Sequence, residues 1–220
     1  MAATARAPEG VGIVLAGGAS TRMGGGDKCL LPLGGRPLLA HVIERLRPQI
    51  GALVINANGD AARFAQFGLP VVPDSIGGLQ GPLAGVHAGI AWVRANRPDA
   101  RFVITAAADT PFFPGDLTQN FLAVLGSGPP KLLVASSEEG LHPVFGLWQV
   151  ALAPALHESL QRGERKVSAW VKEHGAEEVY FPPIKIGNRK VDPFFNLNRP
   201  EDFAEAEALL RAQAGLDADG

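Results

Sequence analysis

Over its first 110 residues the chain alternates short apolar runs with stretches of helical periodicity. Residues 11–16 are apolar, rich in β-branched side chains and without polar alternation, which is typical of a strand buried on both faces of a parallel sheet. Further strands are expected at 52–56, 69–72 and 101–108, with helices at 37–48, 60–66 and 82–95 between them. This order predicts βαβ units, and hence a three-layer α/β/α fold around a mainly parallel sheet.

The second half of the chain is less regular. Strands are expected at 131–136 and 143–148, and helices at 151–162, 167–174 and 200–214. Because the sequence has no internal repeat and no low-complexity linker, we interpret residues 10–214 as one domain. Residues 1–9 are expected to form a flexible N-terminal extension, and residues 215–220 a flexible tail.

Composition excludes several classes of protein. The net charge of −2 argues against a nucleic-acid binder, which would carry a basic surface. The single cysteine excludes a disulfide framework, and no apolar run approaches the roughly 18 residues of a membrane span. The N-terminus has no apolar signal-peptide core. We therefore expect a cytoplasmic protein that binds neither nucleic acid nor membrane.

Glycine is over-represented, with 27 residues, and 14 of them lie in the stretches 10–35 and 77–89. These stretches flank the loops that follow the first and third expected strands. We attribute the excess to loops in which the backbone must approach a ligand closely, because side chains would obstruct that approach.

Polar and charged groups follow each of the first four expected strands, at the edge where open parallel sheets bind ligands. The first strand leads into Leu15-Ala-Gly-Gly-Ala-Ser-Thr-Arg-Met-Gly-Gly-Gly-Asp-Lys28. Gly17 and Gly18 would let backbone N–H groups face phosphate oxygens, while Arg22 and Lys28 supply positive charge. The loop matches neither a P-loop nor a dinucleotide-binding fingerprint, which excludes a nicotinamide-binding domain. It predicts a different kind of phosphate cradle.

Asn56, Asp74 and Asp109 follow the second, third and fourth strands. Each also has an ordinary structural interpretation: Asp109 as the cap of a following helix, Asp74 as a turn residue, and Asn56 as a partner for turn backbone. We favour a ligand-binding role for Asp109, because it ends a buried strand opposite Lys28. His142 stands before an expected strand, either as a turn residue or as part of a substrate site.

The string from Leu15 to Lys28 resembles the signature of the molybdenum cofactor guanylyltransferases, within the sugar-nucleotidyltransferase-like superfamily. Landmarks similar to those of this family continue in family order over about residues 11–203: Pro37-Leu38, Asn56-Ala-Asn58, Asp74, Gly81-Pro-Leu-Ala-Gly85, Asp109-Thr-Pro111, His142-Pro143, Gly163-Glu-Arg-Lys-Val167 and Asn196-Leu-Asn198. The resemblance implies transfer of GMP from GTP to the terminal phosphate of molybdopterin, with release of pyrophosphate. It also implies a requirement for Mg²⁺, and it is compatible with transient contact with proteins that insert the cofactor.

The resemblance assigns roles to the matching residues. Lys28 would bind the phosphates and Asp109 the magnesium ion. The guanine nucleotide would also be held by Leu15, Ala16, Gly17, Gly18, Asn56 and Asp74, and Arg22 is added as a phosphate-binding residue on grounds of charge. Candidates for the acceptor site are His142, Arg165, Lys166, Asn196 and Asn198, the last of which is also a candidate neighbour of the metal.

Three other functions remain to be distinguished. A molybdopterin cytidylyltransferase typically has Leu-Ala-Ala-Gly in the first loop, whereas Gly17-Gly18 and Asp27-Lys28 favour guanylyl transfer. A sugar-phosphate nucleotidyltransferase is usually a longer chain. A non-catalytic GTP-binding module would not need to retain Lys28, Asp74 and Asp109 together.

Overall fold

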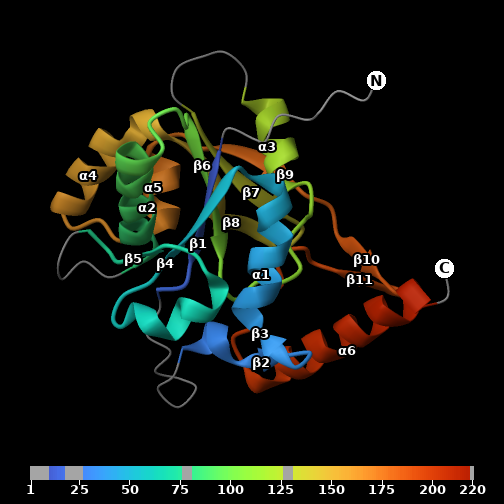
Figure 1. Cartoon of the computed structure of the whole chain (residues 1–220). Helices are drawn as coiled ribbons and strands as arrows, with labels where there is room; N and C mark the ends of the chain where they lie inside the picture. The colour runs from blue at the N-terminus through green and yellow to red at the C-terminus, as the bar shows by residue number, and fades with distance from the viewer. Residues whose placement is uncertain (1–9, 18–26, 76–80, 126–130, 219–220) are drawn as a thin grey trace, which may run out of the picture.

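The computed structural model describes residues 10–17, 27–75, 81–125 and 131–218. Its main sheet has seven strands in the order β5-β4-β1-β6-β8-β7-β9 (Figure 1). The strand β8 runs antiparallel to β6 and β7, and the other neighbouring pairs are parallel, which confirms the mainly parallel sheet. The strands are β1 (Val11–Leu15), β4 (Ala52–Asn56), β5 (Val71–Val72), β6 (Phe102–Ala107), β7 (Leu132–Ser137), β8 (Gly140–Gln149) and β9 (Glu177–Tyr180).

Helices cover both faces of this sheet, which confirms the three-layer fold. On one face lie α2 (Pro82–Asn96), α4 (Ala153–Gln161) and α5 (Val167–Glu173), and on the other α1 (Leu38–Leu46) and α3 (Leu117–Val124) (Figure 1). Successive residues of a strand point to opposite faces, so Ile13 packs in the core with Ile90 of α2, while Val14 packs in the core with Leu39 of α1. Each fully buried side chain of this kind contributes about 1.5–3 kcal/mol through removal of apolar surface from water.

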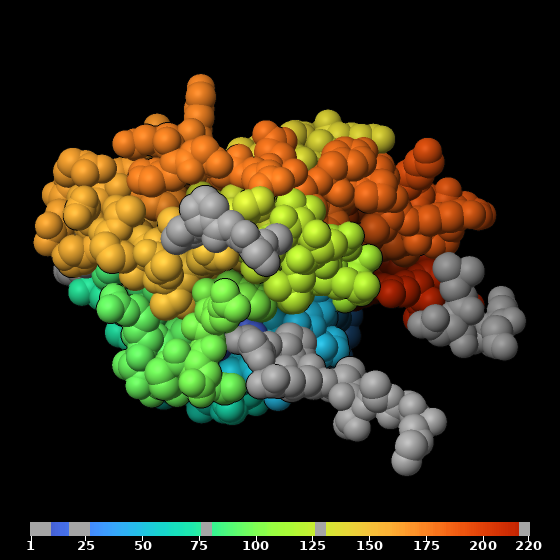
Figure 2. All heavy atoms as spheres, turned by 90° about the horizontal axis from the view of Figure 1, so that it is seen from above, coloured from blue at the N-terminus to red at the C-terminus, as the bar shows by residue number. Residues whose placement is uncertain are grey.

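A third apolar cluster, beside the sheet, joins an early hairpin to the C-terminal part of the chain. It contains Leu33 from the hairpin of β2 (Pro32–Leu33) and β3 (Arg36–Pro37), and Ile186 from the hairpin of β10 (Ile184–Ile186) and β11 (Arg189–Val191). Leu209 of α6 (Pro200–Ala218) belongs to the same cluster. In Figure 2 the orange and red C-terminal residues accordingly lie along one side of the molecule. This cluster holds the segment before α6 against the end of the main sheet.

Several elements differ from the expectations. The two hairpins, β9 and α3 were not expected, because elements this short carry little periodicity. The helix α6 runs to Ala218 rather than ending at 214. The strand β8 starts at Gly140, so the turn interpretation of His142 is wrong; His142 is paired with Ala135. The β7–β8 register shifts between Val134 and Ala135, which accommodates Pro143 within the strand.

In the described part of the chain, four 3₁₀ helices connect these elements: η1 (Lys28–Leu30), η2 (Arg47–Gln49), η3 (Ala61–Phe67) and η4 (Val150–Leu152).

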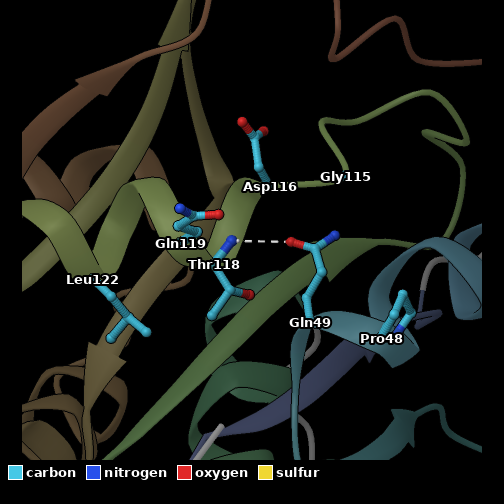
Figure 3. A pocket seen from close by; sticks show the side chains of 7 residues that line it. All are labelled: Pro48, Gln49, Gly115, Asp116, Thr118, Gln119 and Leu122. Atoms are coloured by element: carbon cyan, nitrogen blue, oxygen red, sulfur yellow. Dashed lines mark hydrogen bonds between the residues drawn. The ribbon is translucent and has the colours of Figure 1, made fainter. Parts of the chain in front are cut away.

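The Gln49 side chain of η2 connects the chain before α3 to α1. Its Nε2 donates to the carbonyls of Arg45 and Pro114, and its Oε1 accepts from the backbone N–H of Thr118 at 3.0 Å (Figure 3). Gln49 and Thr118 border a cavity of about 300 Å³, whose lining includes none of the expected site residues.

The residue at the start of α3 is Asp116, and Asp109 lies well before it. The alternative in which Asp109 caps the helix after its strand is therefore wrong. No helix in the described part of the chain has both the length and the apolar character needed to cross a membrane.

Candidate active site

The carboxyl ends of β4, β1 and β6 lie side by side, because the three strands are adjacent and parallel. Leu15 is in register with Asn56 on one side and with Ala107 on the other. The Ala16 N–H donates to the Asn56 carbonyl at 2.9 Å, and the Leu15 carbonyl accepts from the Ala108 N–H at 3.1 Å. The backbone of residues 15–17 therefore emerges between the two strand ends that carry Asn56 and Asp109.

Lys28 lies at the centre of this edge. Its Nζ donates to Asp109 Oδ2 at 2.5 Å and to Asn198 Oδ1 at 2.8 Å. The Lys28 and Asp109 side chains are 17% and 22% exposed, so the ion pair is largely shielded but open on one side. The Leu197 N–H also donates to the Asp109 carbonyl at 3.0 Å, which fixes the segment before α6 against the end of β6. Three predicted site residues from distant parts of the sequence therefore form one cluster.

A second polar cluster follows β4. The Asn56 Nδ2 donates to the Asp74 carboxylate at 3.0 Å and to the Val72 carbonyl at 3.0 Å. Asn58 clasps the same aspartate, because its Nδ2 donates to the other Asp74 oxygen at 2.8 Å and its Oδ1 accepts from the Asp74 N–H at 2.8 Å. The structure therefore brings Asn56 and Asp74 together, and adds Asn58, which sequence reasoning did not select. The Asn-x-Asn spacing at the end of a strand was the available signal.

Asn56 packs closely against glycines from two elements. A Cβ atom on Gly85 of α2 would lie 2.1 Å from Asn56 Oδ1, and one on Gly17 would lie 3.6 Å from the same atom. The first distance is far below van der Waals contact, so Gly85 is required for α2 to approach the strand end. The Asn56 side chain is thus held between β1 and α2, with only 2% of the residue exposed.

The acceptor-site candidates fall in two places besides the Lys28 cluster. His142 and Asn196 both line a cavity of about 410 Å³, together with Phe194 and Phe195. His142 packs against Phe194, with ring centroids 4.4 Å apart and the rings tilted by 30°. Sequence reasoning missed the neighbouring pair Ser137 and Asp192, because these residues meet only across strand and loop.

The ionisation of His142 follows from these contacts. Burial lowers the pKa of its imidazole below the ordinary value, although the carboxylates of Asp192 and Glu139 oppose this shift. The Ser137 hydroxyl donates to Asp192 and lies 2.7 Å from His142 Nε2. Because that hydroxyl hydrogen is already used, His142 Nε2 is the donor in its hydrogen bond with Ser137.

Arg165 and Lys166 lie beside the start of α2. A Cβ atom added to Gly81 would lie 3.2 Å from the Arg165 carbonyl oxygen. Gly81 precedes Gly85 by about one helical turn. Glu164 Oε1 accepts from the backbone N–H groups of Arg165 and Lys166, at 2.8 Å each. Both basic side chains are exposed. Within the described residues, no hydrogen bond or ion pair joins them to the Lys28 cluster.

Two further candidates, Gly18 and Arg22, lie outside the described residues. Cys29, next to Lys28, is 5% exposed. Burial, followed by the charge of Asp27, raises the pKa of its thiol to about 12. The thiol is therefore protonated at neutral pH and is no nucleophile, and Cys29 belongs to the hydrophobic core.

The donor atoms near Asp109 suit a hard divalent cation. The Lys28 ammonium already sits between a carboxylate oxygen and an amide oxygen, so these atoms converge on a positively charged group. Magnesium prefers such oxygen ligands and takes few of them from the protein, keeping waters and substrate phosphates. Among the residues described, no group of three or more His, Cys, Asp and Glu side chains is arranged to hold a metal. The fit to magnesium therefore rests on Asp109 and Asn198.

Comparison with known proteins identifies the family. Residues 12–179 match the model of the MobA-like NTP transferase domain. A molybdenum cofactor guanylyltransferase of Mesorhizobium japonicum is 46% identical over 202 residues, which cover 91% of this chain and 96% of the relative. One of Bradyrhizobium is 48% identical over 199 residues, covering 90% and 92%.

Solved structures share the fold. Molybdopterin-guanine dinucleotide biosynthesis protein A of Archaeoglobus fulgidus superimposes with a TM-score of 0.67 at 22% identity, covering 91% of this chain and 98% of the other. A putative glucose-1-phosphate thymidylyltransferase of Bacillus anthracis has a TM-score of 0.68 at 15% identity, covering 91% and 94%. From the family model and the close relatives, the chain belongs to the molybdenum cofactor guanylyltransferases, within the MobA-like NTP transferases.

Proposed function

We propose that the edge of the sheet around Lys28 and Asp109 is where this guanylyltransferase joins GMP from GTP to the terminal phosphate of molybdopterin. The observation that carries this assignment is the convergence of Lys28, Asp109 and Asn198 beside the strand end at residues 15–17. A cation and two oxygen donors at the carboxyl edge of a parallel sheet suit a polyphosphate and its metal.

The reaction needs positioning and charge neutralisation more than proton transfer. An oxygen of the acceptor phosphate attacks the α-phosphorus of GTP, the bond from that phosphorus to the bridging oxygen breaks, and pyrophosphate leaves. A phosphate monoester has a second pKa near 6, so the attacking oxygen is already ionised and requires no general base. Lys28 offsets negative charge that builds up where two phosphates meet.

Asp109, with Asn198 beside it, would hold the magnesium ion. Bound there, magnesium would neutralise phosphate charge and stabilise the departing pyrophosphate. When the phosphates arrive, the Lys28 ammonium has an alternative anionic partner to Asp109, which leaves the carboxylate available. Lys28 and Asp109 would thus be paired before the nucleotide binds and would exchange partners afterwards, with Lys28 on the phosphates and Asp109 on the metal.

The nucleoside would lie over residues 15–17, beside Asn56 and Asp74. The Asp74 carboxylate is held by two asparagine side chains, so its orientation is fixed before a nucleotide binds. Gly18 and Arg22 belong to the loop that would complete the phosphate cradle.

For the acceptor, two places offer suitable chemistry. His142 and Asn196 line an aromatic-walled cavity, whereas Arg165 and Lys166 present two exposed cations. The cavity suits the planar pterin, and the cations suit its phosphate.

The decisive experiment mixes the protein with magnesium, metal-loaded molybdopterin and either GTP or CTP. Pyrophosphate release and the appearance of the guanine dinucleotide with GTP, but not with CTP, are the expected results. Preference for CTP would replace this proposal with the cytidylyl reaction. GTP binding without product would instead support a non-catalytic module.

A further inference from the structure

Arg63, on the 3₁₀ helix η3, connects the two polar clusters at the sheet edge. Its Nε forms an ion pair with Asp27, the residue directly before Lys28. Its Nη2 donates to the Asn58 carbonyl at 2.5 Å, and its Nη1 donates to the Asp60 carbonyl at 2.6 Å. One guanidinium therefore touches both the segment that delivers Lys28 and the segment that clasps Asp74.

Arg63 is enclosed from several sides, and its buried Nε meets Asp27 as an ion pair without hydrogen-bond geometry. The Arg63 and Asp27 side chains are 27% and 26% exposed, and the guanidinium carbon lies 4.6 Å from the centre of the Phe64 ring. Gly59 has φ +83°, a conformation that favours glycine, and a Cβ there would lie only 3.2 Å from Arg63 Nη1. The backbone at 58–60 thus wraps around this side chain, which distinguishes it from a mobile surface arginine.

The charge of Asp27 makes this contact important for the neighbouring site. An unpaired carboxylate next to Lys28 would compete with phosphate for the ammonium, and would itself repel an incoming polyphosphate. The Lys28 ammonium is already bonded to Asp109 and Asn198, so Asp27 must be held elsewhere for that arrangement to persist. Arg63 supplies the opposite charge, and its donors are fixed by backbone carbonyls rather than by another flexible side chain.

We propose that Arg63 is a positioning residue for the nucleotide: it neutralises Asp27, leaving Lys28 for the phosphates, and fixes Asn58 so that Asp74 faces the nucleoside. The proposal rests on the function assigned above, because it takes Lys28 and Asp74 as nucleotide contacts. It adds a residue to the binding machinery that lies in none of the motifs and touches no reacting atom.

The test compares Arg63→Met, Arg63→Lys, Asp27→Asn and the double variant Arg63→Met with Asp27→Asn. The measurements are the Kd of GTP, and KM for GTP with kcat in the transfer reaction. Arg63→Met is expected to weaken GTP binding about tenfold or more, as loss of a hydrogen-bonded charge usually does, with a smaller change in kcat. Arg63→Lys should be intermediate, because lysine keeps the charge but not the forked donors.

The double variant separates charge from scaffolding. If Arg63 acts by neutralising Asp27, removing both charges should restore part of the GTP affinity lost in Arg63→Met. Arg189→Met, which breaks an exposed ion pair with Glu205, is the matched control and should leave GTP binding unchanged. Thermal denaturation of each variant identifies any that fail to fold. If Arg63→Met is one of them, GTP binding is compared between the Arg63→Lys variant, the double variant and the unmodified protein.

Two results would overturn the inference. One is Arg63→Met with a GTP affinity within twofold of the unmodified protein. The other is a double variant no better than Arg63→Met, which would reduce the ion pair to a structural contact. Failure of the unmodified protein to bind GTP would refute the proposed function itself, so the two failures are distinguishable.

Discussion

Replacing Asp109 with asparagine tests the site most directly, because it removes one charge and almost no volume. The Lys28–Asp109 pair is about four-fifths buried and has a contact distance of 2.5 Å. Breaking an exposed pair costs at most about 1 kcal/mol, and breaking a fully buried one costs about 3–5 kcal/mol. Since the amide oxygen of the new asparagine can still accept a hydrogen bond from Lys28, we expect Asp109→Asn to lower the free energy of unfolding by about 2 kcal/mol. For a chain of this size the melting temperature should fall by about 4–8 °C.

The effect of Asp109→Asn on catalysis should be much larger. Loss of the proposed metal-binding carboxylate is expected to lower turnover about 100-fold or more, a typical cost of removing preorganised charge stabilisation. GTP binding measured in EDTA should be unchanged or tighter, because Lys28 is no longer neutralised by a carboxylate. The assays are pyrophosphate release with saturating magnesium, GTP titration without metal, and thermal denaturation.

The control for that variant is Asp116→Asn, which changes an exposed carboxylate at the start of α3. It should keep normal turnover. The reasoning would be refuted if Asp109→Asn retained turnover within tenfold of the unmodified protein, or if Asp116→Asn lost as much. Weaker GTP binding in EDTA would contradict the assigned competition between Asp109 and phosphate for Lys28.

Three further predictions concern packing and pH. In Gly85→Ala the new methyl group meets Asn56 Oδ1 at 2.1 Å, so thermal unfolding should show a loss of about 1–3 kcal/mol together with weaker GTP binding. Gly115→Ala should change neither, because among the described residues its Cβ would meet nothing within 4 Å apart from its chain neighbours. Thr118→Val should raise the free energy of unfolding by up to about 1 kcal/mol in urea titrations, because the buried Thr118 hydroxyl has no hydrogen-bond partner among the described residues. A loss of stability would show that the hydroxyl does form a hydrogen bond. Burial lowers the pKa of His142, so the unfolded chain binds more protons and stability should fall as pH drops from about 6.5 towards the lowered value. His142→Gln should reduce this dependence in urea titrations at about pH 7.5 and 5.5, and an unchanged dependence would assign it to other groups.

The strands that build the site could be predicted because each is a local apolar pattern. β1, β4 and β6 lie close to their expected bounds, and their parallel alignment follows from the helices between them. That alignment alone predicts that Leu15, Asn56 and Asp109 share an edge. The turn alternative for His142 was wrong because a strand that continues through a proline at a register shift carries no regular pattern.

The glycine-rich stretches show where composition was insufficient. The excess was attributed to close approach of a ligand, but Gly89 serves packing between elements: a Cβ there would lie 2.1 Å from the Ile13 side chain. Gly12 is similar, since its Cβ would lie 2.5 Å from Ile50. Composition cannot distinguish a glycine that lies against a ligand from one that lies against a helix, because a side chain would clash in both cases.

The sequence by itself determined the layered α/β fold, the edge at which the site lies and most of the residue types found there, because these depend on local periodicity and on motifs at strand ends. Only the tertiary structure decided which side chains meet. Lys28 and Asn198 are 170 positions apart, and Arg63, which pairs with Asp27, belongs to no motif. Such contacts depend on how the C-terminal segment and η3 pack against the sheet, and no local pattern records the distance between two elements.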